Sequence, residues 1–322
     1  MEDSIMLHQH PELFRSAIKE TADNLNIRDF FIEKDYWISL VLKRLSESRY
    51  VDSVVFKGGT SLSKGYKLIN RFSEDVDIAV IDVADSSGNQ LKTLIRTVEK
   101  EIAQDLVEST VDGITSKGSR FRKSVYQYPE TQERKMQETY LNTLIVEINS
   151  FANPYPYSRL EIQSLIGEYL HKNNQTDLIR EHGLEPFKVN ILDIKQTLIE
   201  KLVSLIRFSF AENYLDELSG KIRHFYDLYF LLNNKDCSSY FESSQFMNDF
   251  RTVFAHDQRA FDEPRGWNAK QMNESPIFNN FDEIWKTLKS QYVKELSLLA
   301  FTEIPNERDI SKNFGKIIKA FE

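Results

Sequence analysis

The chain is poor in glycine, and three of its eleven glycines fall within eight positions, in the segment FKGGTSLSKG at residues 56–65. A short apolar run at 54–56 precedes the turn, and a helix-like stretch from residue 60 to about 69 follows it. The segment therefore predicts a strand, a glycine turn and a helix. Glycines at such a turn let the backbone approach a ligand closely, and the start of the next helix offers unpaired N–H groups that suit a phosphate. A tight turn with a Ser or Thr cap explains the same residues equally well.

Helices and strands alternate along the first 192 residues, which predicts a mixed sheet covered by helices. Apolar spacing indicates helices at 11–26, near 29–45 and at 91–106, and strands at 76–81, 123–128, 143–151, 160–162 and 188–192. From residue 193 only helices are expected, at 194–210, 214–232, 244–254, 281–299 and 306–321, with 256–280 as a long surface connection. We therefore expect an α/β domain at 1–192 and a mainly helical lobe at 193–322.

Composition narrows the class of protein. The 322 residues hold 41 Lys and Arg against 49 Asp and Glu, a formal charge of -8, which argues against binding nucleic acid by overall charge. A single cysteine, Cys237, excludes an intramolecular disulfide, so a reducing cytoplasm is the expected location. We expect no membrane association, because no run approaches the roughly 18 to 20 apolar residues of a spanning helix.

Two carboxylates follow the glycine turn, in RFSEDVDIAV at 71–80. Asp75 and Asp77 stand two positions apart at the mouth of a predicted strand, where side chains at i and i+2 point to the same face. Such a pair can hold Mg²⁺, which takes oxygen ligands and keeps other positions for water and phosphates. Glu147, in the strand-like TLIVEINSF, is a candidate third ligand. There are alternatives to a metal site: the Asp-x-Asp pair can arise by chance in an acidic chain, and Glu147 can be an outward-facing residue of a half-exposed strand.

The glycine turn and the acidic strand together resemble a known signature. The segment GGTSLSKGYKLINRFSEDVDIAV, with its pattern Arg71-x-Ser73-x-Asp75-x-Asp77, is similar to the DNA polymerase β-like nucleotidyltransferases, and in its close form to the AbiEii/AbiGii toxin family, which includes the MenT toxins. FIEKDYWISLVLKRL at 31–45, TLIEKLVSLIRFSF at 197–210 and IRHFYDLYFLL at 222–232 resemble further motifs of that family in the expected order. The likeness runs from about residue 10 to 235.

The resemblance implies a nucleotidyltransferase-like sheet domain whose active site the helical lobe completes. It implies Mg²⁺ or Mn²⁺ bound by Asp75 and Asp77, and Lys201 and Asp227 as an essential pair from the helical lobe. A lysine is a compact charge that suits a phosphate, and a nearby carboxylate could orient the lysine or assist the hydroxyl nucleophile. The alternative is that Lys201 and Asp227 are ordinary surface charges on amphipathic helices. His224 departs from the family pattern, which often has Asp there. The expected nucleotide-binding residues are Gly58, Gly59, Thr60, Ser61, Ser73 and Lys201.

The implied reaction is attack of an acceptor hydroxyl on the α-phosphate of an NTP, with release of pyrophosphate. The family implies an RNA acceptor, specifically tRNA, and a cognate antitoxin protein. A basic strip with interleaved aromatic residues is a candidate RNA contact, although a solvated β-hairpin explains it as well. Its cations are Lys117, Arg120, Arg122 and Lys123.

Two other functions fit the same residues. One is a phosphotransferase that acts on protein serine, including its own Ser61, Ser63 or Ser73. The other is a non-catalytic nucleotide-binding regulator, which the presence of both Asp75 and Asp77 disfavours.

Overall fold

The computed structural model describes residues 5–81, 86–129 and 142–321. Their contacts divide the chain into two compact units: Met1–Gly65 with Ser73–Leu192, and Tyr66–Phe72 with Asp193–Glu322. The first unit carries the sheet and the second is helical, so the expected α/β fold class with a helical C-terminal part is confirmed. No helix of the described ranges combines the length and apolar character that crossing a membrane requires.

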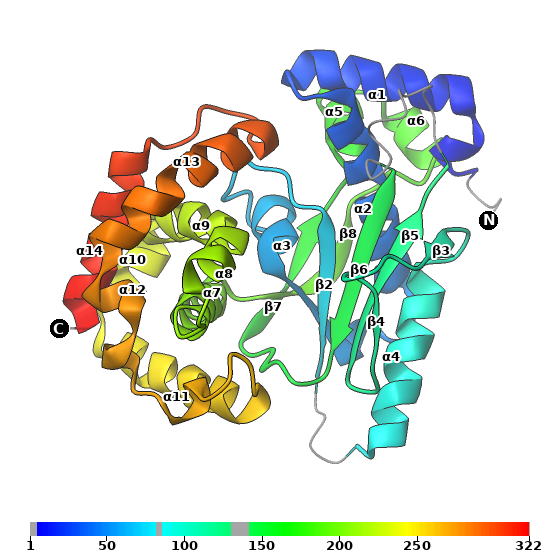
Figure 1. Cartoon of the computed structure of the whole chain (residues 1–322). Coiled ribbons are helices and arrows are strands. Elements are labelled where there is room, and N and C mark those ends of the chain that lie inside the picture. Colours follow the sequence, from blue (N-terminus) through cyan, green and yellow to red (C-terminus); the bar gives the residue numbers. More distant parts are fainter. Residues whose placement is uncertain (1–4, 82–85, 130–141, 322) are drawn as a thin grey trace. The chain divides into compact units, whose positions relative to one another are not determined.

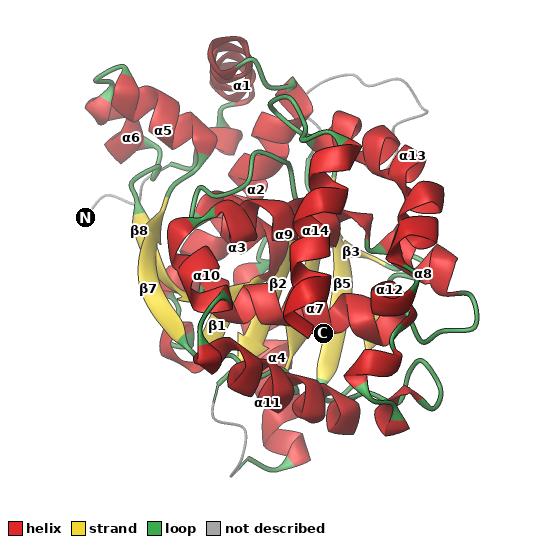
Figure 2. Ribbon diagram, turned by 90° about the vertical axis from the view of Figure 1, so that its left-hand side faces the viewer, coloured by secondary structure: helices red, strands yellow, loops and turns green. Residues whose placement is uncertain are grey.

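In the described part of the first unit, eight strands form one mixed sheet. Their order is β3-β5-β6-β2-β1-β8-β7, with β4 beside β5, and Figure 2 shows β7 and β8 together at one edge. β2 runs parallel to β6, and β1 parallel to β8, whereas the other neighbours are antiparallel. The strands are β1 (Val54–Lys57), β2 (Asp75–Val80), β3 (Val107–Ser109), β4 (Ser116–Lys117), β5 (Phe121–Gln127), β6 (Thr143–Asn149), β7 (Tyr157–Ile162) and β8 (Phe187–Leu192).

The sheet has one apolar face and one charged face at its centre. Val76 and Ile78 of β2 pair with Val146 and Ile148 of β6, and all four side chains are fully buried. Residues at alternate positions point to the opposite face, so the same two strands present Asp75, Asp77 and Glu147 together. The alternation therefore separates the core from a row of ionisable groups.

Helices of the first unit pack around this sheet. α2 and α4 both contact β6 and each other, and Figure 1 shows α4 alongside the sheet. α1, α5 and α6 share a second apolar cluster with α2, and these helices gather at one end in Figure 1. The bounds are η1 (Leu7–Gln9), α1 (Pro11–Leu25), α2 (Asp29–Glu47), η2 (Val51–Ser53), α3 (Gly58–Lys64), α4 (Gly88–Ile102), α5 (Leu165–Lys172) and α6 (Thr176–Glu181).

The second unit is a helical assembly around aromatic side chains. Phe225 lies within 5.3 Å, ring centre to ring centre, of both Trp285 and Phe314, and all three are buried. The helices are α7 (Ile194–Phe208), α8 (Tyr214–Gly220), α9 (Ile222–Asn233), α10 (Lys235–Phe241), α11 (Ser244–Ala260), η4 (Trp267–Ala269), η5 (Met272–Glu274), α12 (Pro276–Asn279), α13 (Phe281–Leu299) and α14 (Glu307–Phe321).

Two expectations for the second unit are wrong. The stretch 214–232 is two helices, because the chain leaves helical geometry at Lys221, after Gly220, a poor helix former. The stretch 256–280 is more than a surface connection: α11 extends to Ala260, and Trp267 is completely buried, with its indole N–H donating to the Phe261 carbonyl at 2.8 Å.

The segment Tyr66–Phe72 was expected in the first domain, and the structure places it in the second unit. The expected helix to about residue 69 ends at Lys64 instead. The Phe72 N–H donates to the Leu299 carbonyl, and the Phe301 N–H donates to the Asn70 carbonyl, both at 2.8 Å. These backbone bonds tie the segment to the end of α13, so a contiguous 1–192 domain is too simple.

Candidate active site

A row of four charged residues crosses the centre of the sheet, one from each of four neighbouring strands. Lys57 of β1 pairs with Asp77 of β2, Asp77 with Glu147 of β6, and Glu147 with Lys123 of β5. Paired residues on adjacent strands point to the same face. The charged row therefore reads positive, negative, negative, positive on one face, with Asp75 two positions along β2.

The two central carboxylates of the row repel each other. Burial, then Glu147 and Asp75, raise the pKa of Asp77 from 3.8 to about 8, against the opposing effect of Lys57 and Lys123. The outer lysines thus compensate only part of the negative charge. An added cation near Asp77 would lower this electrostatic cost.

The glycine turn lies directly against the Asp77 carboxylate. Gly58 has φ +81°, a left-handed conformation that favours glycine, and a Cβ built on it would stand 2.0 Å from Asp77 Oδ2. Both the backbone and the neighbouring carboxylate therefore require glycine at this position. The contact brings the turn and the acidic strand into one site, as the motif spacing predicts.

Hydroxyl groups of the turn fix its shape. Thr60 Oγ1 donates to the Asp75 carbonyl at 2.6 Å, and Ser61 Oγ donates to the Gly58 carbonyl at 2.8 Å. Thr60, Ser61 and Ser73 are all buried. The hydroxyl protons of Thr60 and Ser61 are thus engaged within the protein, which leaves the backbone amides of the turn, Gly59 included, as the groups suited to a phosphate.

Buried charges on α2 hold the elements that flank the turn. The Lys64 ammonium, at the end of α3, lies 2.5 Å from Asp35 Oδ1, and Asp35 Oδ2 accepts from the Leu165 N–H at 2.7 Å. Lys34 lies 3.5 Å from Glu74, next to Asp75. The Lys64 ammonium is therefore engaged by the Asp35 carboxylate of α2. Asp35 and Lys34 were found in the sequence only as part of a family motif.

The acidic pair suits a divalent cation with few protein ligands. Across residues 5–81, 86–129 and 142–321, no three His, Cys, Asp or Glu side chains gather closely enough to hold a metal ion. Glu147 lies 3.4 Å from the Lys123 ammonium instead of completing such a group. Mg²⁺ usually binds one or two carboxylates plus water and phosphate oxygens, so Asp75 and the crowded Asp77 fit it.

The second unit holds a separate buried ion cluster around Asp227. Arg71 donates to both oxygens of Asp227, at 2.8 and 2.7 Å, and Lys201 Nζ lies 2.8 Å from Asp227 Oδ2. Burial alone would raise the pKa of Asp227, but Arg71 and Lys201 hold it well below its usual range. The structure thus brings Lys201 and Asp227 together, and adds Arg71, to which the sequence motif gave no role.

His224 lies one turn before Asp227 on α9. Burial, Lys201 and Lys221 hold the pKa of His224 well below its ordinary value, so the imidazole is neutral at neutral pH. A neutral ring next to two cations adds no charge to the cluster.

The basic strip predicted as an RNA contact is mostly neutralised by carboxylates. Lys117 lies 2.7 Å from Glu108, Arg122 lies 2.5 Å from Glu99 on α4, and Lys123 belongs to the charged row. Arg122 and Lys123 are neighbours on a strand and so point to opposite faces. Only Arg120 of the four is exposed without an ion pair among the described residues.

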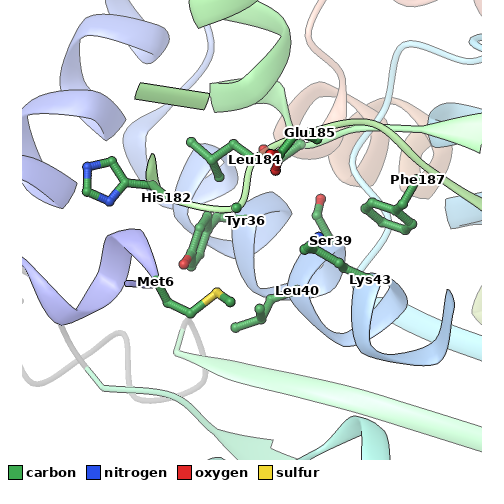
Figure 3. A pocket seen from close by; sticks show the side chains of 11 residues that line it. Met6, Tyr36, Ser39, Leu40, Lys43, His182, Leu184, Glu185 and Phe187 are labelled. Carbon is green, nitrogen blue, oxygen red and sulfur yellow. The ribbon is translucent and has the colours of Figure 1, made fainter. Parts of the chain in front are cut away.

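A small cavity beside α2 does not bear on catalysis. Figure 3 shows the residues that line it, among them Tyr36, Leu40 and Lys43 of α2 and the segment from His182 to Phe187. Its volume of about 20 Å³ has room for roughly one water molecule.

Comparisons with known proteins agree with the motifs. A family described as "Nucleotidyl transferase AbiEii toxin, Type IV TA system" matches residues 40–313. Two solved structures are similar. MenT4, a nucleotidyltransferase toxin from Mycobacterium tuberculosis H37Rv, shares 16% sequence identity with this chain, and the match covers 85% of this chain and 98% of MenT4 with a TM-score of 0.40. A putative nucleotidyltransferase from H. pylori shares 17% identity, and the match covers 84% of this chain and 98% of that chain with a TM-score of 0.35. A search of curated proteins gave no significant match. The family match covers most of the chain, which therefore belongs to the AbiEii family of nucleotidyltransferase toxins of type IV toxin–antitoxin systems.

Proposed function

We propose that this nucleotidyltransferase transfers a nucleoside monophosphate from an NTP to an RNA hydroxyl, with release of pyrophosphate, and that Mg²⁺ or Mn²⁺ assists the reaction. The observation that carries the proposal is the packing of Asp77, with its raised pKa, against the glycine turn at Gly58. At this contact the backbone amides of the turn, which suit a phosphate, belong to a segment that lies against a carboxylate pair that suits a cation.

The step requires positioning more than covalent chemistry from the protein. An RNA hydroxyl oxygen forms a bond to the α-phosphorus, the bond between that phosphorus and the bridging oxygen to the β-phosphate breaks, and the hydroxyl proton passes to water. Asp75 and Asp77 would hold the metal, which supplies charge neutralisation at the phosphates. Lys57 and Lys123, at the ends of the charged row, would balance the remaining charge.

Lys201 and Asp227 receive different roles in this proposal. Asp227 has no exposed side-chain surface and meets two cations, so it is a poor base for a hydroxyl. We assign it the positioning of Lys201, whose ammonium is the compact charge suited to a phosphate oxygen. Because Asp227 accepts from Arg71 as well, loss of its charge should disturb both cations.

The acceptor is the least constrained part of the proposal. RNA, and tRNA in particular, is supported by the family resemblance, and the family implies a nucleotide substrate and a cognate antitoxin. Transfer of phosphate to Ser61 or Ser73 of the protein itself is disfavoured, because Ser61 is completely buried and Ser73 is 8% exposed, whereas the half-buried Ser63 is left as an acceptor for the label experiment below to test.

Labelled nucleotides test the reaction. The protein is incubated with tRNA and each NTP labelled at the α- or the γ-phosphate, with Mg²⁺ or with a chelator. We expect α-label to enter RNA only with the metal, and Asp75→Asn and Asp77→Asn to lower the rate by more than about 100-fold. Glu161→Gln, which removes an exposed carboxylate from β7 of the same sheet, is the matched control and should keep the rate.

Each other result points to another function. Transfer of γ-label to protein indicates a phosphotransferase, and binding of NTP without transfer of either label indicates a regulator. If both Asn variants transfer label at the wild-type rate, the reaction does not require Asp75 and Asp77.

A further inference from the structure

A basic groove lies between α13 and α14 in the second unit, outside the residues that the motifs identify. Its volume is about 430 Å³, within the range of ligand-binding clefts. We call it the α13–α14 groove. It is lined by Asp282, Trp285, Lys286 and Lys289 of α13 and by Glu307, Arg308, Ser311 and Lys312 of α14.

Helical spacing directs the cations of each helix to the same side. Lys286 and Lys289 are three residues apart on α13, and Arg308 and Lys312 are four apart on α14. Residues at these spacings are neighbours on one helix face. The two faces border one groove, so four cations from two consecutive helices share it.

Most of these cations lack a compensating carboxylate. Lys289, Arg308 and Lys312 form no ion pair with any residue in the described ranges, and all three are exposed. Lys286 lies 3.7 Å from Glu283, but both side chains are about 70% exposed, so the pair contributes little. With Asp282 and Glu307 counted, four positive and two negative side chains leave an excess of two positive charges in a chain of net charge -8.

The groove lacks the apolar anchors of a protein-binding site. Its one aromatic residue, Trp285, is 5% exposed, and its indole N–H donates to the Glu307 carbonyl at 2.9 Å. Protein interfaces depend on buried aromatic or aliphatic anchors at their centre, whereas a phosphate backbone is bound by lysine, arginine and hydroxyl groups. Ser311 and the four cations match the second description.

We infer that the α13–α14 groove binds the phosphate backbone of the RNA acceptor. The inference rests on the proposed function for the identity of the polyanion. It assigns RNA binding to the helical unit, since Arg122 and Lys123 of the β4–β5 hairpin are held by Glu99 and Glu147, which leaves that hairpin only Arg120 and the exposed Lys117, itself 2.7 Å from Glu108, among the described residues.

The salt dependence of RNA binding measures these contacts. Each neutralised phosphate contributes about 0.7 to 0.9 to the slope of log affinity against log salt. Loss of three contacts therefore reduces the change in affinity between about 50 and 200 mM salt by roughly 20- to 40-fold.

The test measures anisotropy of fluorescently labelled tRNA, without NTP, for three full-length proteins. The groove variant is Lys289→Glu/Arg308→Glu/Lys312→Glu. Its matched control, Lys294→Glu/Lys316→Glu/Lys319→Glu, changes exposed lysines on the same two helices outside the groove and alters the net charge equally. We expect the groove variant to bind more weakly and with the reduced salt slope, and the control to stay within about threefold of wild type. Thermal melting of both variants checks that the fold is intact.

Several results would overturn the inference: equal weakening by both variants, no weakening by the groove variant, or no binding of tRNA by the wild-type protein. Binding of poly-glutamate that the groove variant loses while tRNA binding persists would assign the groove to an acidic protein instead. The two proposals fail separately. If wild type incorporates α-label and the groove variant binds tRNA normally, the inference about the groove is wrong. If the groove variant loses tRNA binding but wild type incorporates no label, the proposed transfer reaction is wrong.

Discussion

Replacing Asp77 with asparagine should stabilise the ligand-free protein while it abolishes nucleotide transfer. The pKa of Asp77 rises from 3.8 to about 8, with burial as the largest cause and the neighbouring carboxylates next. In the unfolded chain this carboxyl loses its proton near pH 4, whereas the folded chain keeps it until about pH 8. The folded state therefore binds more protons between these values, and its stability falls as pH rises.

The size of the effect follows from the proton difference. One pKa unit corresponds to about 1.4 kcal/mol, so Asp77 lowers the free energy of unfolding by at most about 1.4 kcal/mol for each pH unit between its two pKa values. Water and counter-ions near a half-buried group screen part of it, and we expect the advantage of asparagine to widen by roughly 1–2 kcal/mol between about pH 5.5 and 7.5. At about 2–4 °C per kcal/mol, the difference in Tm should grow by several degrees.

Thermal melts at the two pH values, with a chelator present, measure this difference. The control is Asp177→Asn, which removes a carboxylate that is 98% exposed and should change Tm by less than about 2 °C. A lower Tm for Asp77→Asn at both pH values, or a gap that does not change with pH, would refute the electrostatic reasoning.

Three further substitutions test the packing around the site. Gly58→Ala should lower the free energy of unfolding, measured in urea, by at least about 2 kcal/mol more than Gly266→Ala does. Both glycines have φ +81°, but a Cβ at Gly266 meets nothing within 4 Å, whereas one at Gly58 meets the Asp77 carboxylate. Equal losses of stability would contradict this close contact. Asp35→Asn should destabilise the protein by about 2–4 kcal/mol, because it leaves the buried Lys64 ammonium without its anion; a change in Tm below 1 °C would show that the pair is dispensable. Asp227→Asn should cost about 3–5 kcal/mol by leaving two buried cations unpaired, and an unshifted thermal transition would rule this out.

The centre of the site could be predicted from sequence because its information is local. The apolar run, the glycine turn and the i, i+2 spacing of Asp75 and Asp77 are contained in fewer than thirty residues, and the strand period alone places both carboxylates on one face. The close approach of Gly58 to Asp77 follows the same motif.

The rest depends on tertiary contacts between distant segments. The charged row exists because β1, β2, β6 and β5 are neighbours in one register, and nothing local pairs Lys123 with Glu147. The buried charges of α2 would be read as a solvent-facing stripe, since Lys64 and Glu74 lie about thirty to forty residues away in the chain. Arg71 likewise needs its partner on α9, 156 residues on.

The most direct test of the proposed transfer reaction is the stoichiometry of pyrophosphate release and α-label incorporation into tRNA, for wild type and Asp77→Asn side by side. We expect one pyrophosphate for each nucleotide added by the wild-type protein, and neither product above background from the variant. Incorporation by the variant at the wild-type rate, or label transfer without pyrophosphate, would contradict it.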